Sequence, residues 1–274
     1  MPVAHRDILL TGIPRSGTTL ACRLLSELPG VVALNEPMRT AQYRSAADAL
    51  AAIPAFYATT RQSILCAGVA TARAVNGRMT DNHFTSVRGH RTKRVEKQPI
   101  RIVKPLRPDF RLVCKHNALF SILREQLVGR YAYFAIIRNP LAILASWNSV
   151  PIPAGRGEVR AMRYLLPATA RRLERAGDLY ARQLFILDWY FRQYQSLPAH
   201  RIIRYEQIVA TGGKASKVID PDAVSLRAAL TNRNRSPIYD WEAMATVAAR
   251  LLRAENACWS FYDKFQVEEL LTPP

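Results

Sequence analysis

The chain of 274 residues has a length within the range of single-domain α/β proteins, and 49% of hydrophobic residues is enough for a full core. An excess of 39 Lys and Arg over 21 Asp and Glu leaves a formal net charge of +18. That charge favours an anionic partner, such as a nucleotide, an acidic glycan, nucleic acid or a membrane surface, although arginines that merely coat the surface would account for part of it.

Cysteine usage and hydropathy exclude several classes of protein. The four cysteines, Cys22, Cys66, Cys114 and Cys258, form no CxxC pair, so the sequence indicates neither a metal site nor a disulfide framework. The N-terminal apolar run is too short for a signal peptide, and no stretch approaches the ~20 apolar residues that span a bilayer. We therefore predict a reduced, cytoplasmic protein without a transmembrane segment or a metal ion.

The first elements in chain order form a strand, a glycine-containing turn, a helix and a second strand. Residues 7–12 are a short apolar run that ends in glycine, which is typical of a buried parallel strand. Leucines at helical spacing predict a helix over 18–30, which Pro-Gly ends, and 31–37 is the second strand. This arrangement is a βαβ unit.

The later elements continue the alternation of strands and helices. We expect strands at 110–117, 131–140 and 201–209, and helical segments at 41–75 (for the most part), 118–128, 141–150, 169–198 and 222–258. Residues 87–108 carry eight Lys or Arg and one Glu, which predicts a basic surface excursion with a hairpin near 99–105. With no linker in between, we predict one domain over 1–274, a three-layer α/β sandwich around a parallel sheet.

The turn between the first strand and helix, "GIPRSGTT", is spaced like a phosphate-binding loop. Gly12 and Gly17 allow the backbone to turn tightly and to aim its N–H groups inward, next to the positive end of the helix. Arg15 adds a fixed charge, and Thr18 and Thr19 add hydroxyl donors. The loop predicts an anion site, although a plain strand–helix turn would contain similar residues.

The lysine that usually follows the second glycine of such a loop is missing, because Thr18 stands there. In kinases and NTPases that lysine contacts the β- and γ-phosphates, and a strand-end aspartate helps to hold Mg²⁺. Neither feature is evident here. The expected ligand therefore has no polyphosphate to clamp and needs no metal.

Two motifs resemble the sulfotransferases that use 3′-phosphoadenosine 5′-phosphosulfate (PAPS). Residues 14–20, "PRSGTTL", are similar to the family's 5′-phosphosulfate loop, and 136–147, "IIRNPLAILASW", to its 3′-phosphate motif. In that second motif a strand-end Arg and a Ser eight positions later hold the 3′-phosphate, here Arg138 and Ser146. The segment "RYEQIV" resembles a later strand and turn of the family, which nominates Tyr205 as a neighbour of the adenine.

The resemblance implies a P-loop-like enzyme that transfers a sulfuryl group from PAPS to an acceptor hydroxyl and releases PAP, the desulfated product. A sulfuryl group on a single phosphate carries less negative charge than a γ-phosphate, so main-chain N–H groups and one cation suffice. The residues that the resemblance assigns to PAPS binding are Arg15, Ser16, Gly17, Thr18, Thr19, Arg138, Ser146 and Tyr205.

Transfer requires a base for the acceptor proton and a donor for the leaving oxygen. Glu36 ends the second strand, where glycan-modifying and bacterial members of the family resemble this chain in having a glutamate base. His116 is the alternative, but it directly follows Lys115, whereas the cytosolic members have one residue between their Lys and His. We favour Glu36, with Lys115 and Arg15 at the leaving group. The acceptor is then expected to be a hydroxyl of a carbohydrate or glycolipid, and an anionic glycan is one candidate because the basic stretch 87–108 would attract it. A small alcohol, a phenol or a carrier-bound intermediate stays open, and the basic stretch could equally be a solvated charged loop.

Two further regions are candidates for ligand contacts. The basic loop at 231–237 could act as a lid that brings Arg233 or Arg235 to the 3′-phosphate. Aromatic residues of the expected long helix either belong to the core or line the acceptor cleft, and these are Trp189, Tyr190, Phe191 and Tyr194.

Two other functions stay open at this point. A nucleotide or small-metabolite kinase with a degenerate loop would bind ATP with Mg²⁺, although the missing lysine argues against it. A nucleic-acid-binding protein is compatible with the charge, but the sequence contains no recognised nucleic-acid motif.

Overall fold

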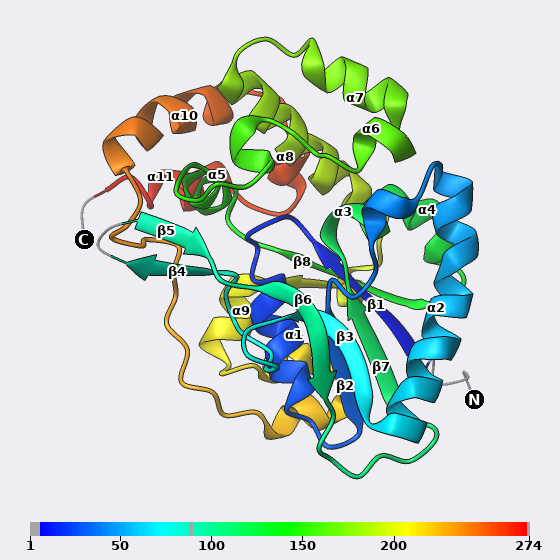
Figure 1. Cartoon of the computed structure of the whole chain (residues 1–274). Helices are drawn as coiled ribbons and strands as arrows, with labels where there is room; N and C mark the ends of the chain where they lie inside the picture. The colour runs from blue at the N-terminus through cyan, green and yellow to red at the C-terminus, as the bar shows by residue number, and fades with distance from the viewer. Residues whose placement is uncertain (1–5, 88–89, 273–274) are drawn as a thin grey trace.

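A parallel five-stranded sheet forms the centre of the computed structural model, which describes residues 6–87 and 90–272 (Figure 1). The strand order is β2–β7–β1–β8–β9, so the N-terminal strand lies in the middle of the sheet. The strands are β1 (Asp7–Gly12), β2 (Val31–Asn35), β7 (Arg111–Lys115), β8 (Ala132–Ile137) and β9 (Ile202–Arg204). All five were expected, and the parallel α/β architecture is confirmed.

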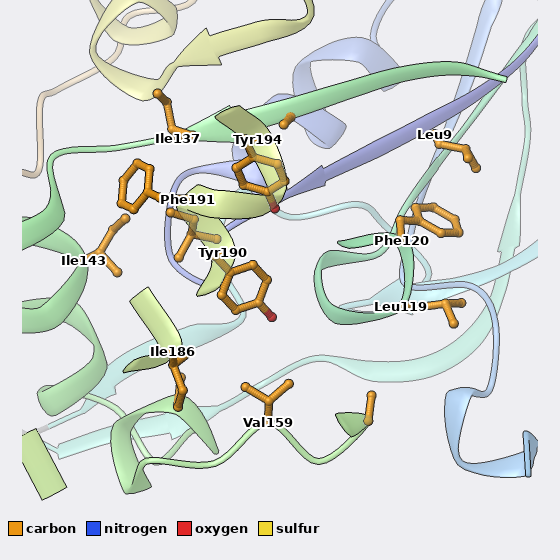
Figure 2. Packing of buried hydrophobic residues seen from close by; sticks show 14 of the residues in the cluster. Leu9, Leu119, Phe120, Ile137, Ile143, Val159, Ile186, Tyr190, Phe191 and Tyr194 are labelled. Carbon is orange, nitrogen blue, oxygen red and sulfur yellow. The ribbon is translucent and has the colours of Figure 1, made fainter. Parts of the chain in front are cut away.

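Side chains of β1 alternate between two buried clusters, one on each face of the sheet. Ile8 and Leu10 pack with helix α1 (Thr18–Ser26), whereas Leu9 packs into the larger cluster on the other face. That larger cluster includes residues of α5 (Pro140–Asn148) and α8 (Leu179–Gln195), some of which Figure 2 shows. Helix, sheet and helix therefore make the three layers of the sandwich.

The remaining helices begin where polar side chains cap them or where the chain turns. Ser45, Asp178 and Asp240 each accept a hydrogen bond from a main-chain N–H of the first turn of α2, α8 and α10. The helices not yet described are α2 (Ala46–Ala67), α3 (Asn117–Ile122), α4 (Arg124–Leu127), α6 (Met162–Leu165), α7 (Pro167–Glu174), α9 (Tyr205–Ala210), α10 (Trp241–Arg253) and α11 (Lys264–Glu268). Among the described residues, no helix combines the length and the apolar character needed to cross a membrane.

Two antiparallel strand pairs lie outside the main sheet, and they correct the expectation for 41–75 and for the basic excursion. Helix α2 ends at Gly68, whose φ of 62° is left-handed, and β3 (Val69–Ala74) follows. Strand β3 pairs with β6 (Glu96–Arg101), so the basic stretch forms no hairpin near 99–105. The hairpin consists instead of β4 (Phe84–Val87) and β5 (His90–Lys93), and the part of the excursion at 88–89 lies outside the described residues.

Four expected elements have different bounds in the structure. The helix at 118–128 is divided at Leu123, and the one at 169–198 is interrupted at Gly177, whose φ is 89°. The strand at 201–209 ends at Arg204, because the chain turns there into α9. Of 222–258, only Trp241–Arg253 is α-helical, and residues 226–240 form an extended connection with turns.

Candidate functional site

The candidate site lies at the carboxyl edge of the parallel sheet, where open α/β sheets bind their ligands. Because all five strands run in the same direction, the residue that ends or follows each strand reaches this one edge. Every candidate from the sequence that follows a strand is thus brought to this edge, namely the loop after Gly12, Glu36, His116, Arg138 and Tyr205.

The loop after β1 is held in shape by glycine and serine. A Cβ atom at Gly12 would lie 2.3 Å from the carbonyl oxygen of Ile136, so no larger residue fits. The Ser16 N–H donates to the Ile13 carbonyl at 3.0 Å, and the Ser16 hydroxyl donates to the Ile136 carbonyl at 2.7 Å. The buried Ser16 side chain therefore ties the loop to β8, which is a structural role that the sequence did not indicate.

Gly17 forms the end of the loop and the start of α1. Its φ is 90°, and a Cβ there would lie 2.6 Å from the Tyr205 ring. No side chain caps the first turn of α1, which begins at Thr18, so the main-chain N–H groups of that turn stay available for an anion. Thr19 Oγ1 lies 3.4 Å from His83 Nε2 at the same edge.

Arg138 joins the end of β8 to the loop and to the connection before α10. The Arg138 guanidinium, in a residue that is only 4% exposed, donates to the Arg15 carbonyl at 3.1 Å and to Asn234 Oδ1 at 2.8 Å. It also donates to the Arg233 carbonyl and lies 4.6 Å from the centre of the Tyr205 ring. Arg138 is therefore fixed by protein oxygen atoms and an aromatic face.

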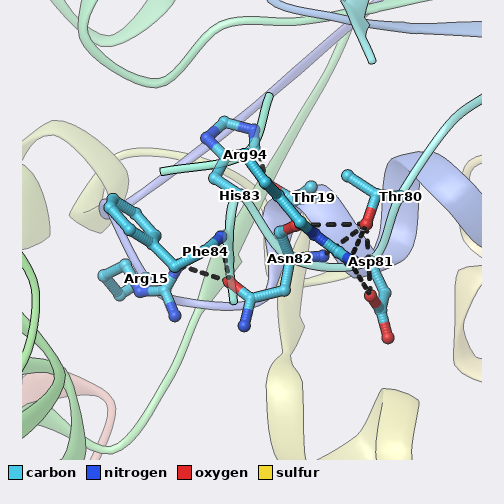
Figure 3. Close-up of polar contacts among 8 residues, drawn as sticks. All are labelled: Arg15, Thr19, Thr80, Asp81, Asn82, His83, Phe84 and Arg94. Atoms are coloured by element: carbon cyan, nitrogen blue, oxygen red, sulfur yellow. Dashed lines mark hydrogen bonds and ion pairs between the residues drawn. The ribbon is translucent and has the colours of Figure 1, made fainter. Parts of the chain in front are cut away.

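The two motifs of the sequence meet at Arg15 and Ser146. Arg15 Nε donates to Ser146 Oγ at 3.0 Å, and Arg15 Nη1 donates to Asn82 Oδ1 at 3.1 Å (Figure 3). The guanidinium also lies 5.4 Å from the centre of the Phe84 ring. Burial, and next the charge of Arg91, lower the pKa of Arg15 to about 10, which leaves it cationic at neutral pH.

Glu36 stands directly after β2 between two cations. Its Oε1 accepts from Lys115 Nζ at 3.0 Å, and its Oε2 accepts from Arg73 Nε at 2.8 Å. Burial alone would raise the pKa of this carboxyl, but the nearby cations, Lys115 foremost, lower it well below its ordinary range. Lys115 itself is only 1% exposed, so Glu36 is the counter-charge of a buried ammonium.

His116 is buried next to Glu36 and Lys115, but its side chain binds a main-chain N–H group instead of the carboxylate. Its Nε2 accepts a hydrogen bond from the Met38 N–H at 3.0 Å, and its ring packs edge-on against Phe120. Burial lowers the pKa of His116 to about 3, so the ring is neutral. The only lone pair of the neutral ring is occupied, which argues against His116 as the base.

Several residues of the site were missed by the sequence analysis. The segment before β4, 80–84, lies over the loop and places Asn82, His83 and Phe84 beside Arg15 and Thr19 (Figure 3). His83 Nε2 also lies 2.6 Å from Asn35 Nδ2. Segment 80–84 has neither helical nor strand periodicity, so nothing in the sequence pattern connects it to the site; Arg73 was missed because β3 was read as helix.

Most of the candidate residues line a cleft of about 1100 Å³, whereas the buried Ser16, His116 and Ser146 are not among its lining residues. Its walls contain ten Lys or Arg residues and three acidic ones, so the cleft attracts anions. Of the two lid candidates, Arg233 lines this cleft, whereas Arg235 lines a separate cavity of about 380 Å³. Of the four aromatic candidates, Tyr190 lines the cleft, Phe191 and Tyr194 are fully buried in the core, and Trp189 is partly buried against it.

Within residues 6–87 and 90–272, no group of three or more His, Cys, Asp or Glu side chains is arranged as metal ligands. The free cysteines Cys22 and Cys114 are buried, as expected for small thiols in a helix and a strand.

Comparisons with known proteins give a structural likeness but no likeness in sequence. No protein-family profile matches the chain, and no curated protein sequence matches it. Among solved structures, the crystal structure of a sulfotransferase from Mycobacterium tuberculosis is 14% identical, with 98% of this chain and 76% of that chain covered and a TM-score of 0.36.

Proposed function

We propose that the protein transfers a sulfuryl group from PAPS to a hydroxyl group of a carbohydrate or glycolipid. The observation that carries this proposal is the contact between the two motifs: Arg15 Nε to Ser146 Oγ at 3.0 Å and Arg138 Nη1 to the Arg15 carbonyl at 3.1 Å. A loop that suits a phosphosulfate and the Arg138 guanidinium, which suits a phosphate, thus line one cleft, and the fully buried Ser146 accepts a hydrogen bond from Arg15 of that loop. A nucleotide with phosphate groups on both sides of its ribose fits this arrangement.

The residues present fit the two ends of this nucleotide. Gly12 and Gly17 let the loop pack directly against Ile136 and Tyr205, and the first turn of α1 offers uncapped N–H groups. Arg138 and Ser146 supply a guanidinium and a hydroxyl for the 3′-phosphate. Tyr205, whose ring lies between Gly17 and Arg138, offers an aromatic surface for the base.

The chemistry proposed for the chain's own residues is proton removal and charge stabilisation. PAPS supplies an activated sulfuryl group; the bond from the acceptor oxygen to sulfur forms as the bond from sulfur to the phosphate oxygen breaks. Glu36 takes the hydroxyl proton, and Arg15 and Lys115 stabilise the charge that develops on the departing phosphate oxygen. The lowered pKa keeps the Glu36 carboxylate ionised at neutral pH, and the same shift makes it a weaker base than an unperturbed glutamate.

Geometry favours Glu36 over His116 as this base. The single lone pair of neutral His116 already accepts the Met38 N–H. Glu36 has two oxygen atoms, each with more than one acceptor position, and each accepts one hydrogen bond, from Arg73 and from Lys115. Glu36 can therefore accept a further hydrogen bond from a substrate hydroxyl.

The test is a titration with PAP, followed by thermal unfolding and by calorimetry. We expect PAP to bind at micromolar concentration and to raise the melting temperature, since a ligand at 100 times its Kd adds about 2.7 kcal/mol of stability. Arg138→Ala should weaken PAP by about 100-fold, because charge-assisted hydrogen bonds to the phosphate are lost. Arg101→Ala, which changes an exposed arginine outside the cleft, is the control.

A protein that ignores PAP but binds ATP in the presence of Mg²⁺ would contradict the proposal and favour a kinase. Steeply salt-dependent binding of RNA or DNA without any response to PAP would favour a nucleic-acid-binding protein.

A further inference from the structure

Three buried side-chain atoms of residues that line the cleft have no hydrogen-bond partner among the described residues, namely Arg91 Nε, the Tyr190 hydroxyl oxygen and Asn117 Oδ1. Two of them belong to uncharged residues, Asn117 and the fully buried Tyr190. Buried polar atoms in native proteins are nearly always hydrogen-bonded, so two unpartnered atoms in residues that line one cleft indicate a polar ligand.

These two atoms lie on the Glu36 side of the cleft. Asn117 lies two residues after Lys115, the last residue of β7, and Lys115 Nζ donates a hydrogen bond to Glu36 Oε1 at 3.0 Å. The Tyr190 ring has its hydroxyl turned away from Phe191 (Figure 2), and Glu36 is near enough to contribute to the raised pKa of that hydroxyl, after burial and Tyr194. Donors and acceptors for a hydroxylated ligand therefore lie beside the proposed base.

The outer rim on the same side carries an unbalanced set of cations. Arg73 of β3 and Lys97 of β6 are directly opposite in the antiparallel pair, and side chains in such a pair share one face. Like charges in this position repel each other. Lys93 of β5 lines the cleft nearby, and neither Lys93 nor Lys97 has a carboxylate within ion-pair distance in the described part of the chain.

Arg73 links this rim to the proposed base. Its Nε donates to Glu36 Oε2 at 2.8 Å, so the rim begins one side chain away from the carboxylate. Burial, together with the charges of Arg73 and Arg39, lowers the pKa of Lys97 to about 8, as expected where cations are crowded. An anion bound at the rim would relieve this repulsion.

We propose that the acceptor is an acidic sugar, whose hydroxyl groups bind Tyr190 and Asn117 while its carboxylate or sulfate ester binds between Arg73, Lys93 and Lys97. The reactive hydroxyl then lies at Glu36, between the two sets of contacts. This inference depends on the proposed function, because it takes Glu36 as the base of the transfer. A neutral sugar would fill the inner contacts but leave the cations of the rim opposed to one another.

Binding of three tetrasaccharides in the presence of saturating PAP tests the proposal. The probes are neutral chitotetraose, unsulfated chondroitin tetrasaccharide with carboxylates alone, and chondroitin 4-sulfate tetrasaccharide with both groups. Calorimetry at fixed ionic strength should show at least one acidic probe binding about tenfold more tightly than the neutral one. The two acidic probes distinguish a carboxylate from a sulfate ester as the group recognised.

Rim variants separate a specific site from a general positive field. We expect Lys93→Gln and Lys97→Gln each to weaken the acidic probe by about fivefold to tenfold and to leave chitotetraose unchanged. Arg101→Gln is the matched control, because Arg101 lies on the same strand as Lys97 but opposite Val69, whereas Lys97 lies opposite Arg73, which lines the cleft. An equal loss in Arg101→Gln would overturn the proposal in favour of non-specific attraction.

Two tyrosines of α8 test the inner wall. Tyr190→Phe removes a hydroxyl without a partner, so it should keep the protein as stable as before and weaken the sugar by about fivefold. Tyr194→Phe removes a hydroxyl that lies 2.8 Å from Ser121 Oγ, so it should lower stability and leave sugar affinity unchanged. The assignment of Tyr190 is contradicted if Tyr190→Phe loses stability and keeps its sugar affinity. It is also contradicted if Tyr194→Phe keeps its stability and binds the sugar more weakly.

The outcomes also separate this proposal from the proposed function. If PAP binds but the neutral probe binds as tightly as the acidic ones, or no probe binds, the acceptor proposal is wrong and the nucleotide site stands. If PAP itself does not bind, the proposed function fails first.

Discussion

The two ends of the cleft handle positive charge in opposite ways. At the end proposed for the nucleotide, called the nucleotide end, Arg138 donates to three protein oxygen atoms and Arg15 donates to two more. At the end proposed for the acceptor, called the acceptor end, Lys93 of the cleft and Lys97 beside it have no carboxylate within ion-pair distance among residues 6–87 and 90–272. Cations that are held in place suit a ligand of fixed shape, whereas mutually repelling cations are retained where a ligand brings the missing negative charge.

Glu36 lies where the two ends meet, and replacing it should have the largest effect. Glu36→Gln keeps the shape but cannot take a proton, so kcat should fall by about 1000-fold, within the usual range for a general base. PAP affinity should change by less than about threefold, because the nucleotide contacts lie on the other strands. Steady-state sulfation of the best acceptor, with calorimetry for PAP, measures both.

Glu96→Gln, at an exposed carboxylate of the rim strand, is the control for that measurement. Because Glu36 is the counter-charge of buried Lys115, a urea titration has to show that the Glu36 variant is folded. Undiminished turnover in a folded Glu36→Gln protein would remove Glu36 from the mechanism.

The nucleotide end should be the less tolerant of a single methyl group. Gly17→Ala places a Cβ at a φ of 90° and 2.6 Å from the Tyr205 ring, which should cost about 1–3 kcal/mol of unfolding free energy and weaken PAP as well. Gly129→Ala is the matched control, because a Cβ there meets no atom within 4 Å. Equal stability of the two variants in urea would show that the loop is not as rigid as its contacts indicate.

Acid should act through two buried histidines of the site, His83 beside Thr19 and Asn35 and His116 beside Met38. Burial lowers the pKa of His83 and of His116 to about 3, against 6.5 for an unperturbed imidazole. The unfolded chain therefore binds protons first, so this stability is complete above pH 6.5 and is lost as the pH falls from there toward 3. Each histidine should remove about 1.4 kcal/mol per pH unit within that window.

Urea titrations across this pH window measure the slope. His116→Asn and His83→Asn should each reduce the slope of unfolding free energy against pH by about half, which reports the two histidines separately. A pH dependence unchanged by both substitutions would contradict the assignment.

The smallest expected effect is on the unfolding free energy, through the repulsion between cations at the acceptor end. Lys97→Gln removes one of two like charges that lie opposite each other, so it should raise the unfolding free energy by about 0.2–0.5 kcal/mol in low salt. Arg138→Ala, at the other end, should lower it, because Asn234 and two main-chain carbonyls lose their donor. A loss of stability in Lys97→Gln would mean that the rim is not repulsive.

The features that could be predicted from the sequence are those with a local cause. The βαβ unit and its loop follow from an apolar run, two glycines and a leucine repeat that are contiguous in the chain. The positions of Glu36 and Arg138 at strand ends could be predicted in the same way, because each residue comes directly after a buried strand. Their convergence needs only that all these strands are parallel.

The features that could not be predicted depend on partners distant in the chain. Strand β3 has an alanine-rich sequence that suits a helix, and it is a strand only because β6 pairs with it. Residues 226–240 cross the site without helical structure because Asn234 and the Arg233 carbonyl bind Arg138. His83 lies by Thr19 for a similar reason, since the segment 80–84 is anchored by Arg15 and Arg94.

By itself, then, the sequence determined the layered fold, the anion-binding turn and the residues at the strand ends, because periodicity and glycine placement act over a few neighbouring residues. Only the tertiary structure decided which of Glu36 and His116 keeps a free acceptor position, and which cations have an oxygen partner. Hydrogen-bond partners and burial are set by segments tens of residues away, such as Met38 for His116 and Arg73 for Glu36.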